Sequence, residues 1–465
     1  MGSHREMAGP AEAHSDTSPP DQSRADQPLQ APASDIDAWF STERTAARDG
    51  GVTITAASYR EFLYDADDPV LADWRGLDYA EFSRRKREPG FVQDLLADWR
   101  ALYDAPYRGI TTDGTLRPEV HALPPTEAAR SEADMAAREA AVEALAALTA
   151  DERARFSYDL DAPEWRAWSN PEFVIHEVGV RLEDLTPYAA DAVLGLVRES
   201  LSEEGYARVA EAMELNGFLG ELTELPALMN GLSYWAAVFG DPAGHGPWGW
   251  QLFGHHVAIS CVFVGGRQVI APVFIGAEPA LSDGARPPIF ATREAAAIAL
   301  ASSLTAEQRA DAVVYESVLD PAMPEGRVHP ADERHVAGAF HDNRDVPYEG
   351  LRASALDEAQ RAALREIVED FLLLLPASAR REELAKVGAH LDETYVAWYG
   401  ATDGSQPFYL RIHSPVILAE LDHHAGVWLS NRVPQRFHVH STLRVPHGND
   451  YAKAYIAQWR ARHPG

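Results

Sequence analysis

The sequence predicts an α+β fold, in which helices are grouped around antiparallel β-hairpins that form a shared sheet core. Three observations predict this class: two hairpin regions with strand-like patterning, helical segments that precede and separate them, and no regular alternation of single strands and helices. A helical N-terminal region comes before this core. The two hairpin regions carry most of the residues that are candidates for chemistry.

The first hairpin region contains two adjacent histidines. Along residues 251–264, apolar side chains alternate with small ones, which is typical of one half-buried strand. His255 and His256 would then point to opposite faces, with His256 on the face of small residues that leaves room for a metal and a substrate. Gly265-Gly266 provides the positive φ values of a tight turn, and residues 268–275 form the returning strand. We therefore expect His256 to be a ligand and His255 to be a core or supporting histidine.

The second hairpin region lies near the C-terminus, where residues 408–422 and 437–445 are predicted as strands. Residues two apart in a strand share a face, so His438 and His440 project side by side, and so do Glu420 and Asp422. Two imidazoles on one strand and a third from another would make an open metal site. The GHH, ELDHH and HVH motifs together support this hypothesis, and its candidate metal ligands are His255, His256, His438, His440 and Glu420.

Helical segments surround the hairpins and divide the chain into three parts. Residues 1–34 are predicted to be an expression tag and a disordered tail, 35–125 a helical N-terminal region, and 126–465 the main α+β domain. Thr149 and Thr305 begin capping-box motifs that mark helix starts. The two hairpin regions suggest a weak internal duplication, but their spacing is irregular and the helices between them do not match. Helices are expected near residues 35–48, 90–103, 127–148, 187–200, 203–219, 354–375 and 377–391.

The composition argues against several classes of protein. The chain has 465 residues, of which 46% are hydrophobic, enough to bury a large core. No apolar run approaches the roughly 18 residues that cross a bilayer, so no membrane partner is expected. The formal net charge of −30 would repel a nucleic-acid backbone. A small-molecule substrate is the expected partner, and a homo-oligomer remains open.

The single cysteine, Cys261, lies on the apolar face of the first predicted strand, so we expect it to be buried and unreactive. The N-terminal residues lack the basic-then-apolar order of a signal peptide. We therefore expect a cytoplasmic location.

Several segments of the chain match one known family in order, among them LTPYAADAVLGLVRESLSEEGYARV, YWAAVFGDPAGHGPWGWQLFGHHVAI and FHVHSTLRVPHGNDYA. From about residue 135 to the C-terminus, the chain resembles the bacterial family known as domain of unknown function 3500. The chain departs from the family pattern at Ser260, where an Asn is usual, and at His413, which takes a usually uncharged position. The resemblance implies the extent of the main domain and no activity. The most recognisable blocks of the family correspond to His255, His256, His438, His440, Arg444, Asn449 and Asp450.

Other side chains are candidates for the chemistry around a metal. Glu420 would be a fourth ligand or a general base, and Asp422 would orient an imidazole. Arg444 and Arg411 could hold a substrate carboxylate by paired hydrogen bonds, although a salt bridge is the simpler role, above all for Arg411. Trp248 and Trp250 could line the bottom of a ligand pocket or could simply pack in a core.

These residues predict a metal-dependent enzyme that acts on a small polar molecule. The simplest reaction is hydrolysis by a water that a divalent first-row metal ion, Zn or Fe, activates. The sequence contains no GxSxG, P-loop, GxGxxG after a strand, HExxH or CxxC motif, so other common reaction classes lack local support. Two alternatives remain open: a non-haem metal oxygenase or oxidase, and a non-catalytic ligand-binding protein with structural histidines.

Overall fold

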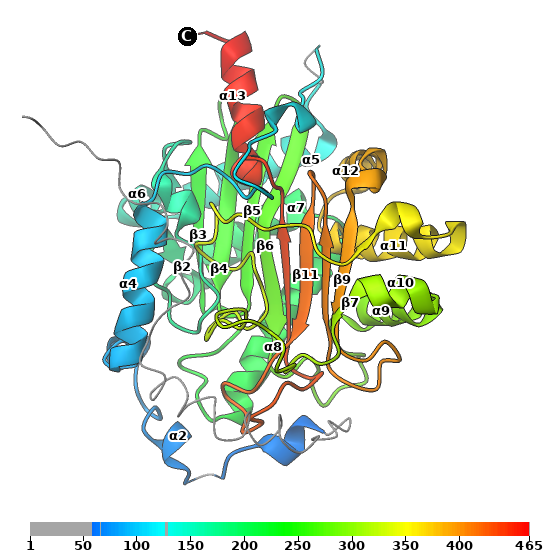
Figure 1. Ribbon diagram of the computed structural model, residues 1–465. Helices are drawn as coiled ribbons and strands as arrows, with labels where there is room; N and C mark the ends of the chain where they lie inside the picture. The colour runs from blue at the N-terminus through cyan, green and yellow to red at the C-terminus, as the bar shows by residue number, and fades with distance from the viewer. Residues whose placement is uncertain (1–57, 66, 126–128, 465) are drawn as a thin grey trace, which may run out of the picture.

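The computed structural model describes residues 58–65, 67–125 and 129–464. The predicted disordered tail and the predicted helix at residues 35–48 lie outside the described residues. One large sheet crosses the protein, with most helices packed on one face, and with long loops and a few helices on the other (Figure 1). The architecture confirms the predicted α+β class.

The sheet contains 12 strands within the described part of the chain and is mostly antiparallel. Their bounds are β1 Ser157–Tyr158, β2 Val180–Arg181, β3 Tyr234–Gly240, β4 Trp248–Gly254, β5 Val257–Val264, β6 Arg267–Ala277, β7 Val313–Tyr315, β8 Leu351–Arg352, β9 Tyr395–Tyr399, β10 Tyr409–His413, β11 Leu418–His423 and β12 Val439–Arg444. The order is β1-β3-β4-β5-β6-β12-β11-β10-β9-β7, with β2 beside β3 and β8 beside β9. The two hairpin regions therefore meet at the centre of the sheet, where β6 pairs with β12.

Several helices start where the sequence predicts, whereas the helices predicted from residues 127 and 354 start at Glu132 and Glu358. Capping boxes at Thr149 and Thr305 satisfy the first free amides of α6 and α10, and Pro187 stands at the first position of α7. The α-helices are α2 Pro69–Ala72, α3 Tyr79–Lys86, α4 Gly90–Asp104, α5 Glu132–Ala147, α6 Ala150–Phe156, α7 Pro187–Ser200, α8 Glu203–Leu222, α9 Ala291–Ser303, α10 Ala306–Ala312, α11 Glu358–Phe371, α12 Ala377–Ala389 and α13 Lys453–Arg462.

The two faces of the sheet differ in character. On the face covered by α5, α7, α8, α9 and α11, the strands contribute apolar side chains to one large core. Cys261 belongs to this core and is fully buried, as predicted, and burial raises the pKa of its thiol. The opposite face, which we call the loop face, carries an apolar cluster beside α3 and α4 and a row of buried polar groups on β10, β11 and β12. The long segment between β7 and β8 runs across this face (Figure 1).

Two of the predicted strands are in fact two strands each. The predicted strand at residues 408–422 divides into β10 and β11, which pair antiparallel. Residues 251–264 divide into the end of β4 and all of β5, and His255 and His256 form the turn between them. His256 has a φ of +64°, a left-handed conformation that belongs to turns and not to strands. The turn also reverses the alternation, so Phe253 packs on the loop face while Val257 packs under the helices. The prediction that the two histidines point to opposite faces of one strand is therefore wrong.

The sheet is built from two copies of one arrangement. In the first copy β1 pairs parallel to β3, and β2 pairs antiparallel to it; in the second, β7 and β8 pair with β9 in the same two ways. A pair of helices, α7 with α8 or α11 with α12, precedes four strands in each copy. The expectation that the intervening helices do not match is therefore wrong. The duplication was hidden because unequal loops separate equivalent elements.

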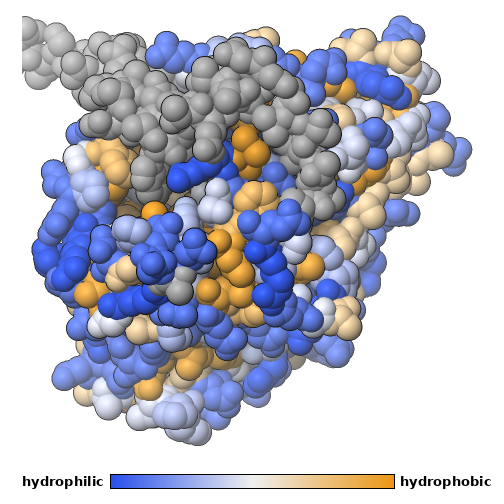
Figure 2. Space-filling model, turned by 90° about the horizontal axis from the view of Figure 1, so that it is seen from below, coloured by the Kyte–Doolittle hydropathy of each residue, from blue (hydrophilic) through white to orange (hydrophobic). Residues whose placement is uncertain are grey.

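The surface is largely hydrophilic in one view of the molecule. Seen from below, hydrophilic residues make up most of the coloured surface, and hydrophobic ones gather in a band near its middle (Figure 2). Among the described residues, no helix combines the length and the apolar content that crossing a bilayer requires.

Candidate metal centre

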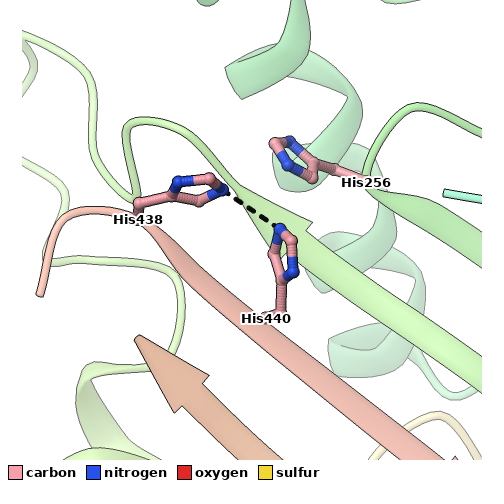
Figure 3. A group of neighbouring side chains, drawn as sticks. All are labelled: His256, His438 and His440. Carbon is pink, nitrogen blue, oxygen red and sulfur yellow. Dashed lines mark hydrogen bonds between the residues drawn. The ribbon is translucent and has the colours of Figure 1, made fainter. Parts of the chain in front are cut away.

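Three of the predicted ligands come together next to the centre of the sheet. His256 reaches the site from the turn before β5, and His438 and His440 reach it from the start of β12 (Figure 3). One nitrogen from each ring lies within 4.8 Å of the others. The predicted meeting of the two hairpins in space is thus what the fold produces, although a turn and not a strand presents His256.

The backbone fixes which nitrogen of His438 is available. Its Nδ1 lies 2.7 Å from the carbonyl oxygen of Ala425, so Nδ1 carries the proton and donates it. Its Nε2, which then has a free lone pair, lies 3.1 Å from Nε2 of His440. Two nitrogens at metal distances of about 2.0–2.1 Å and 3.1 Å apart subtend an angle of about 100° at the ion. That angle lies near the tetrahedral value.

A glycine makes room for the imidazoles. Gly276 pairs with His440 across the sheet, and its amide donates to the carbonyl of His256 at 2.8 Å. A Cβ at this position would stand 2.6 Å from Cδ2 of His440 and 3.1 Å from Cδ2 of His256. Any side chain here would therefore push the two rings apart.

The three histidines are buried, and two of them are held uncharged. His256 and His440 are each 4% exposed, and His438 is fully buried. Burial lowers the pKa of His256 and of His440 well below the usual value, and the neighbouring imidazoles lower it further. Neutral rings with free lone pairs are the form that binds a metal ion.

A second group of possible ligands adjoins the first. It consists of His335, Asp422 and His424, whose ligand atoms also lie within 4.8 Å of one another. The ring of His424 lies 3.8 Å from the ring of His440 between centroids. The ELDHH motif contained His424, but the predicted strand stopped short of it. Nothing near His335 in the sequence marks it, because the long segment between β7 and β8 carries it over the sheet from a distance.

Glu420 lies outside both groups. Its oxygens accept hydrogen bonds from the amides of Val336 and Ala337, at 2.8 and 3.0 Å, and from the hydroxyl of Tyr409 at 2.6 Å. With these partners, Glu420 anchors the segment that carries His335 to the loop face. Its Oε2 also lies 3.7 Å from Nδ1 of His335. The geometry gives Glu420 a positioning role and not the ligand position.

Asp422 shares the face of His440, its partner across β11 and β12. Arg334 donates to both of its oxygens, through the backbone amide at 3.2 Å and Nε at 2.8 Å. Burial alone would raise the pKa of Asp422, but the Arg334 guanidinium and His424 together outweigh burial and hold that pKa below its usual range. Asp422 is therefore ionised beside the histidines.

His255 is turned away from the three-histidine group. Its Nδ1 lies 2.8 Å from the side-chain oxygen of Asn216, and its ring stacks on His256 with centroids 3.9 Å apart. Burial lowers its pKa to about 4. The structure gives His255 the supporting place that the sequence analysis preferred for it.

The predicted substrate-binding residues lie elsewhere. Trp248 and Trp250 are buried under the helices, where their indole N–H groups donate to Asp134 and Ser200 at 3.0 and 2.8 Å. They pack a core on the face opposite to the histidines.

The two arginines are engaged by acidic partners on the loop face. Arg444 donates to Asp342 and Asp450 at 2.6 and 2.8 Å, and Arg411 donates to Glu349 at 2.6 Å. Both arginines are buried in these ion pairs, and neither belongs to the metal-ligand groups.

A third group, His329, Asp332 and His341, lies in the segment between β7 and β8. Oδ2 of Asp332 is 3.5 Å from Nδ1 of His329 and 3.6 Å from Nε2 of His341. However, Nδ1 of His329 also accepts the amides of Ala331 and Asp332, both at 3.2 Å. Those amides occupy the lone pair that a metal would need, so we assign no ion here.

The chain belongs to the family described as protein of unknown function (DUF3500), whose model matches residues 130–453. This confirms the resemblance, and the match includes every residue of the three ligand groups. No curated protein and no solved structure matches the chain. The family description names no reaction, so the function has to be argued from the site.

Proposed function

We propose that this member of the family is a metal-dependent enzyme that hydrolyses a small polar molecule, with the ion held by His256, His438 and His440. The observation that carries the proposal is the convergence of these three buried imidazoles from two hairpins. Their nitrogens lie within 4.8 Å of one another, and a backbone carbonyl fixes the tautomer of His438. Zn or Fe fits a set of nitrogen ligands.

The charge of the ligands favours hydrolysis. Three neutral imidazoles leave the full charge of a divalent ion uncompensated, and such an ion lowers the pKa of a bound water to about 7. Hydroxide is then available at neutral pH without a dedicated general base. Glu420, which the sequence analysis offered as base, has its oxygens engaged by two amides and Tyr409, and hydrolysis by this route does not require it.

A second candidate function rests on the adjoining group. His335, His424 and Asp422 are two histidines and one carboxylate, the ligand set typical of non-haem iron oxygenases. Iron in the purified protein, together with oxygen consumption, would favour this alternative over hydrolysis. Zinc without oxygen consumption would favour the hydrolase.

The proposal is tested by metal content and by hydrolysis of an activated probe. The protein would be purified without chelators, and bound metal measured by elemental analysis in wild type, His256→Asn, His440→Asn and the control His413→Asn. His413 is a suitable control because it is a buried loop-face histidine outside all three groups. We expect wild type and the control to bind metal, and the other two variants to lose it.

Hydrolysis of a nitrophenyl ester should follow the metal. Chelation should abolish the activity and zinc should restore it in wild type, but not in His440→Asn. A wild-type protein that is free of metal and takes up neither zinc nor iron would overturn the proposal and leave the ligand-binding alternative.

A further inference from the structure

We infer that His335, Asp422 and His424 bind a second metal ion, so that the two adjoining groups form one two-metal centre. This inference rests on the proposed function, because it places the second ion beside the first. It also extends the assignment to residues that the three-histidine site does not use.

The spacing of the donors fits an ion. Nε2 of His424 lies 3.3 Å from Oδ2 of Asp422, and the nearest nitrogen of His335 completes a set within 4.8 Å. Ligands at about 2.0–2.2 Å from a zinc-like ion are separated from one another by about 3.0–3.5 Å. All three residues are buried, with 2% of His335, none of Asp422 and 3% of His424 exposed.

Unsatisfied nitrogens point to a missing partner for this group. Nε2 of His335 and Nε2 of His424 are buried and form no hydrogen bond of good geometry, and the nearest partner of His424 is Asp422, at 3.3 Å. A buried polar atom without a partner costs about 1–3 kcal/mol, so two such atoms beside one ionised carboxylate require an explanation. A cation accounts for both nitrogens and for the charge of Asp422 at once.

Neighbouring groups set His335 in the tautomer that a ligand needs. Its Nδ1 lies 2.6 Å from the hydroxyl of Thr442 and 3.7 Å from the Glu420 carboxylate. These acceptors keep the proton on Nδ1 and leave the lone pair on Nε2. A carboxylate behind a ligating histidine is a common arrangement at metal sites. This arrangement assigns the buried Glu420 carboxylate the role of orienting the His335 ring.

The polar contacts of Asp422 leave it free to bind an ion. Arg334 takes one lone pair on each oxygen, and each carboxylate oxygen has a second. Arg334 is held in turn by the carbonyl of His423, at 2.5 Å, and by Glu333, at 2.8 Å. The guanidinium therefore fixes the direction of the carboxylate without occupying it.

The two ligand groups are in direct contact. The ring of His424 lies 3.8 Å from His440 and 5.4 Å from His438 between centroids, and the His335 ring lies 6.3 Å from His440. Asp422 and His440 are paired directly across β11 and β12. Two ions held this way would act on one substrate group, such as an ester, amide or phosphoester. One ion would stabilise the attacking oxygen and the other the leaving oxygen.

Stoichiometry tests the inference. The chelator-treated full-length protein would be titrated with Co²⁺, and bound metal counted for wild type, His335→Asn, His256→Asn and the controls His413→Asn and His341→Asn. We expect two ions in wild type and both controls, and one ion in His335→Asn. Circular dichroism and urea unfolding would establish that each variant folds.

Magnetic coupling gives a readout that does not depend on a variant. Two Co²⁺ ions in one centre should couple, so the electron paramagnetic resonance signal per ion should be weaker with two ions bound than with one. Thr442→Val, which removes only the hydroxyl behind His335, should lower the affinity for the second ion by about 10-fold or more and leave the affinity for the first unchanged.

The outcomes separate the two proposals. One ion in wild type, retained in His335→Asn and lost in His256→Asn, would overturn the second ion and leave the proposed function standing. Two uncoupled ions, one of which is lost in His341→Asn, would move the second ion to the group around Asp332 and overturn this inference. No bound metal at all would overturn both proposals.

Discussion

The two halves of the sheet share a scaffold and differ in what they place on the loop face. Gly179 and Gly350 have φ values of +87° and +88°, and each lies against the equivalent residue of its half, Ala236 or Val396. Gly240 and Gly400 likewise approach Pro247 and Pro407. Gly240 and Gly400 are separated by the same number of residues as Pro247 and Pro407. This common offset relates β3 to β9 and β4 to β10 residue by residue.

The same spacing shows where the halves diverge. Gln251 pairs with Ser260 in the first half, and the equivalent pair in the second is Arg411 with Glu420. One step further along the same face, Val262 pairs with Val269 where the second half has Asp422 with His440. Equivalent positions that are neutral or apolar in one half therefore carry charge or imidazole in the other.

The remaining ligands come from connections that the halves do not share. Gly265-Gly266 joins β5 to β6 directly, whereas residues 424–438 join β11 to β12 and supply His424 and His438. His335 comes from residues 316–350, which replace the shorter segment 159–179. The comparison teaches that the repeated scaffold provides a rigid sheet, and that the second half acquired most of the site on it.

The largest expected effect is a pH dependence to which each half contributes. Burial lowers the pKa of His255, in the first half, and of His424, in the second, to about 4. An unfolded histidine has a pKa of about 6.5, so the metal-free protein takes up protons when it unfolds and loses stability as the pH falls from 6.5 toward 4. The two residues together should lower the free energy of unfolding by roughly 4 kcal/mol between pH 7 and pH 5.

Urea unfolding of the chelated protein at pH 7, 6 and 5 would measure this loss. His255→Gln and His424→Gln should each remove the contribution of one histidine, about 2 kcal/mol, from the pH dependence. A free energy of unfolding that is constant over this range would show that the buried histidines are not held neutral.

The sequence allowed some of this to be predicted, for physical reasons. Capping boxes and the patterning of single strands depend on neighbouring residues, so Thr149, Thr305 and the strand at residues 437–445, which contains β12, were correctly predicted. The turn at His255-His256 was missed because its flanks continue a strand-like alternation, and only the left-handed backbone of His256 reveals it. His335 could not be found, since tertiary hydrogen bonds to Glu420 bring its segment to the site.

Matched glycine variants would test whether the halves are equivalent as scaffolds. In Gly179→Ala and Gly350→Ala, the new methyl group would overlap the backbone at Ala236 or Val396, and the residue would keep a strained positive φ. We expect each variant to lose about 3 kcal/mol or more of unfolding free energy, and the two losses to be similar. Gly388→Ala is the control, because nothing lies within 4 Å of its added Cβ.

Thermal or urea unfolding of the three variants would give the comparison. If only one of the two strained variants were destabilised, the two halves would not contribute equally to stability. The matching pairs, β2 with β3 and β8 with β9, would then be alike in topology alone.

The smallest expected effect is the most local, and it separates the site from the scaffold. Gly276 lies on β6, the strand of the first half that borders the second, and a side chain there would meet the rings of His256 and His440. Gly276→Ala would put a methyl group 2.6 Å from His440 and 3.1 Å from His256, so those rings would have to move by a few tenths of an ångström or more. We expect metal affinity to fall by about 100-fold, at the upper end of the range for residues that support ligands.

Competition with a coloured zinc chelator would measure that affinity, with Gly388→Ala as the control that should bind as wild type does. The methyl group would also stand 3.0 Å from the carbonyl oxygen of Val439 on β12, so circular dichroism and urea unfolding would establish that the variant folds. Unchanged zinc affinity in a folded Gly276→Ala protein would mean that His256 and His440 do not hold one ion. The site would then belong to the second half alone, because His256 is the ligand that the first half provides.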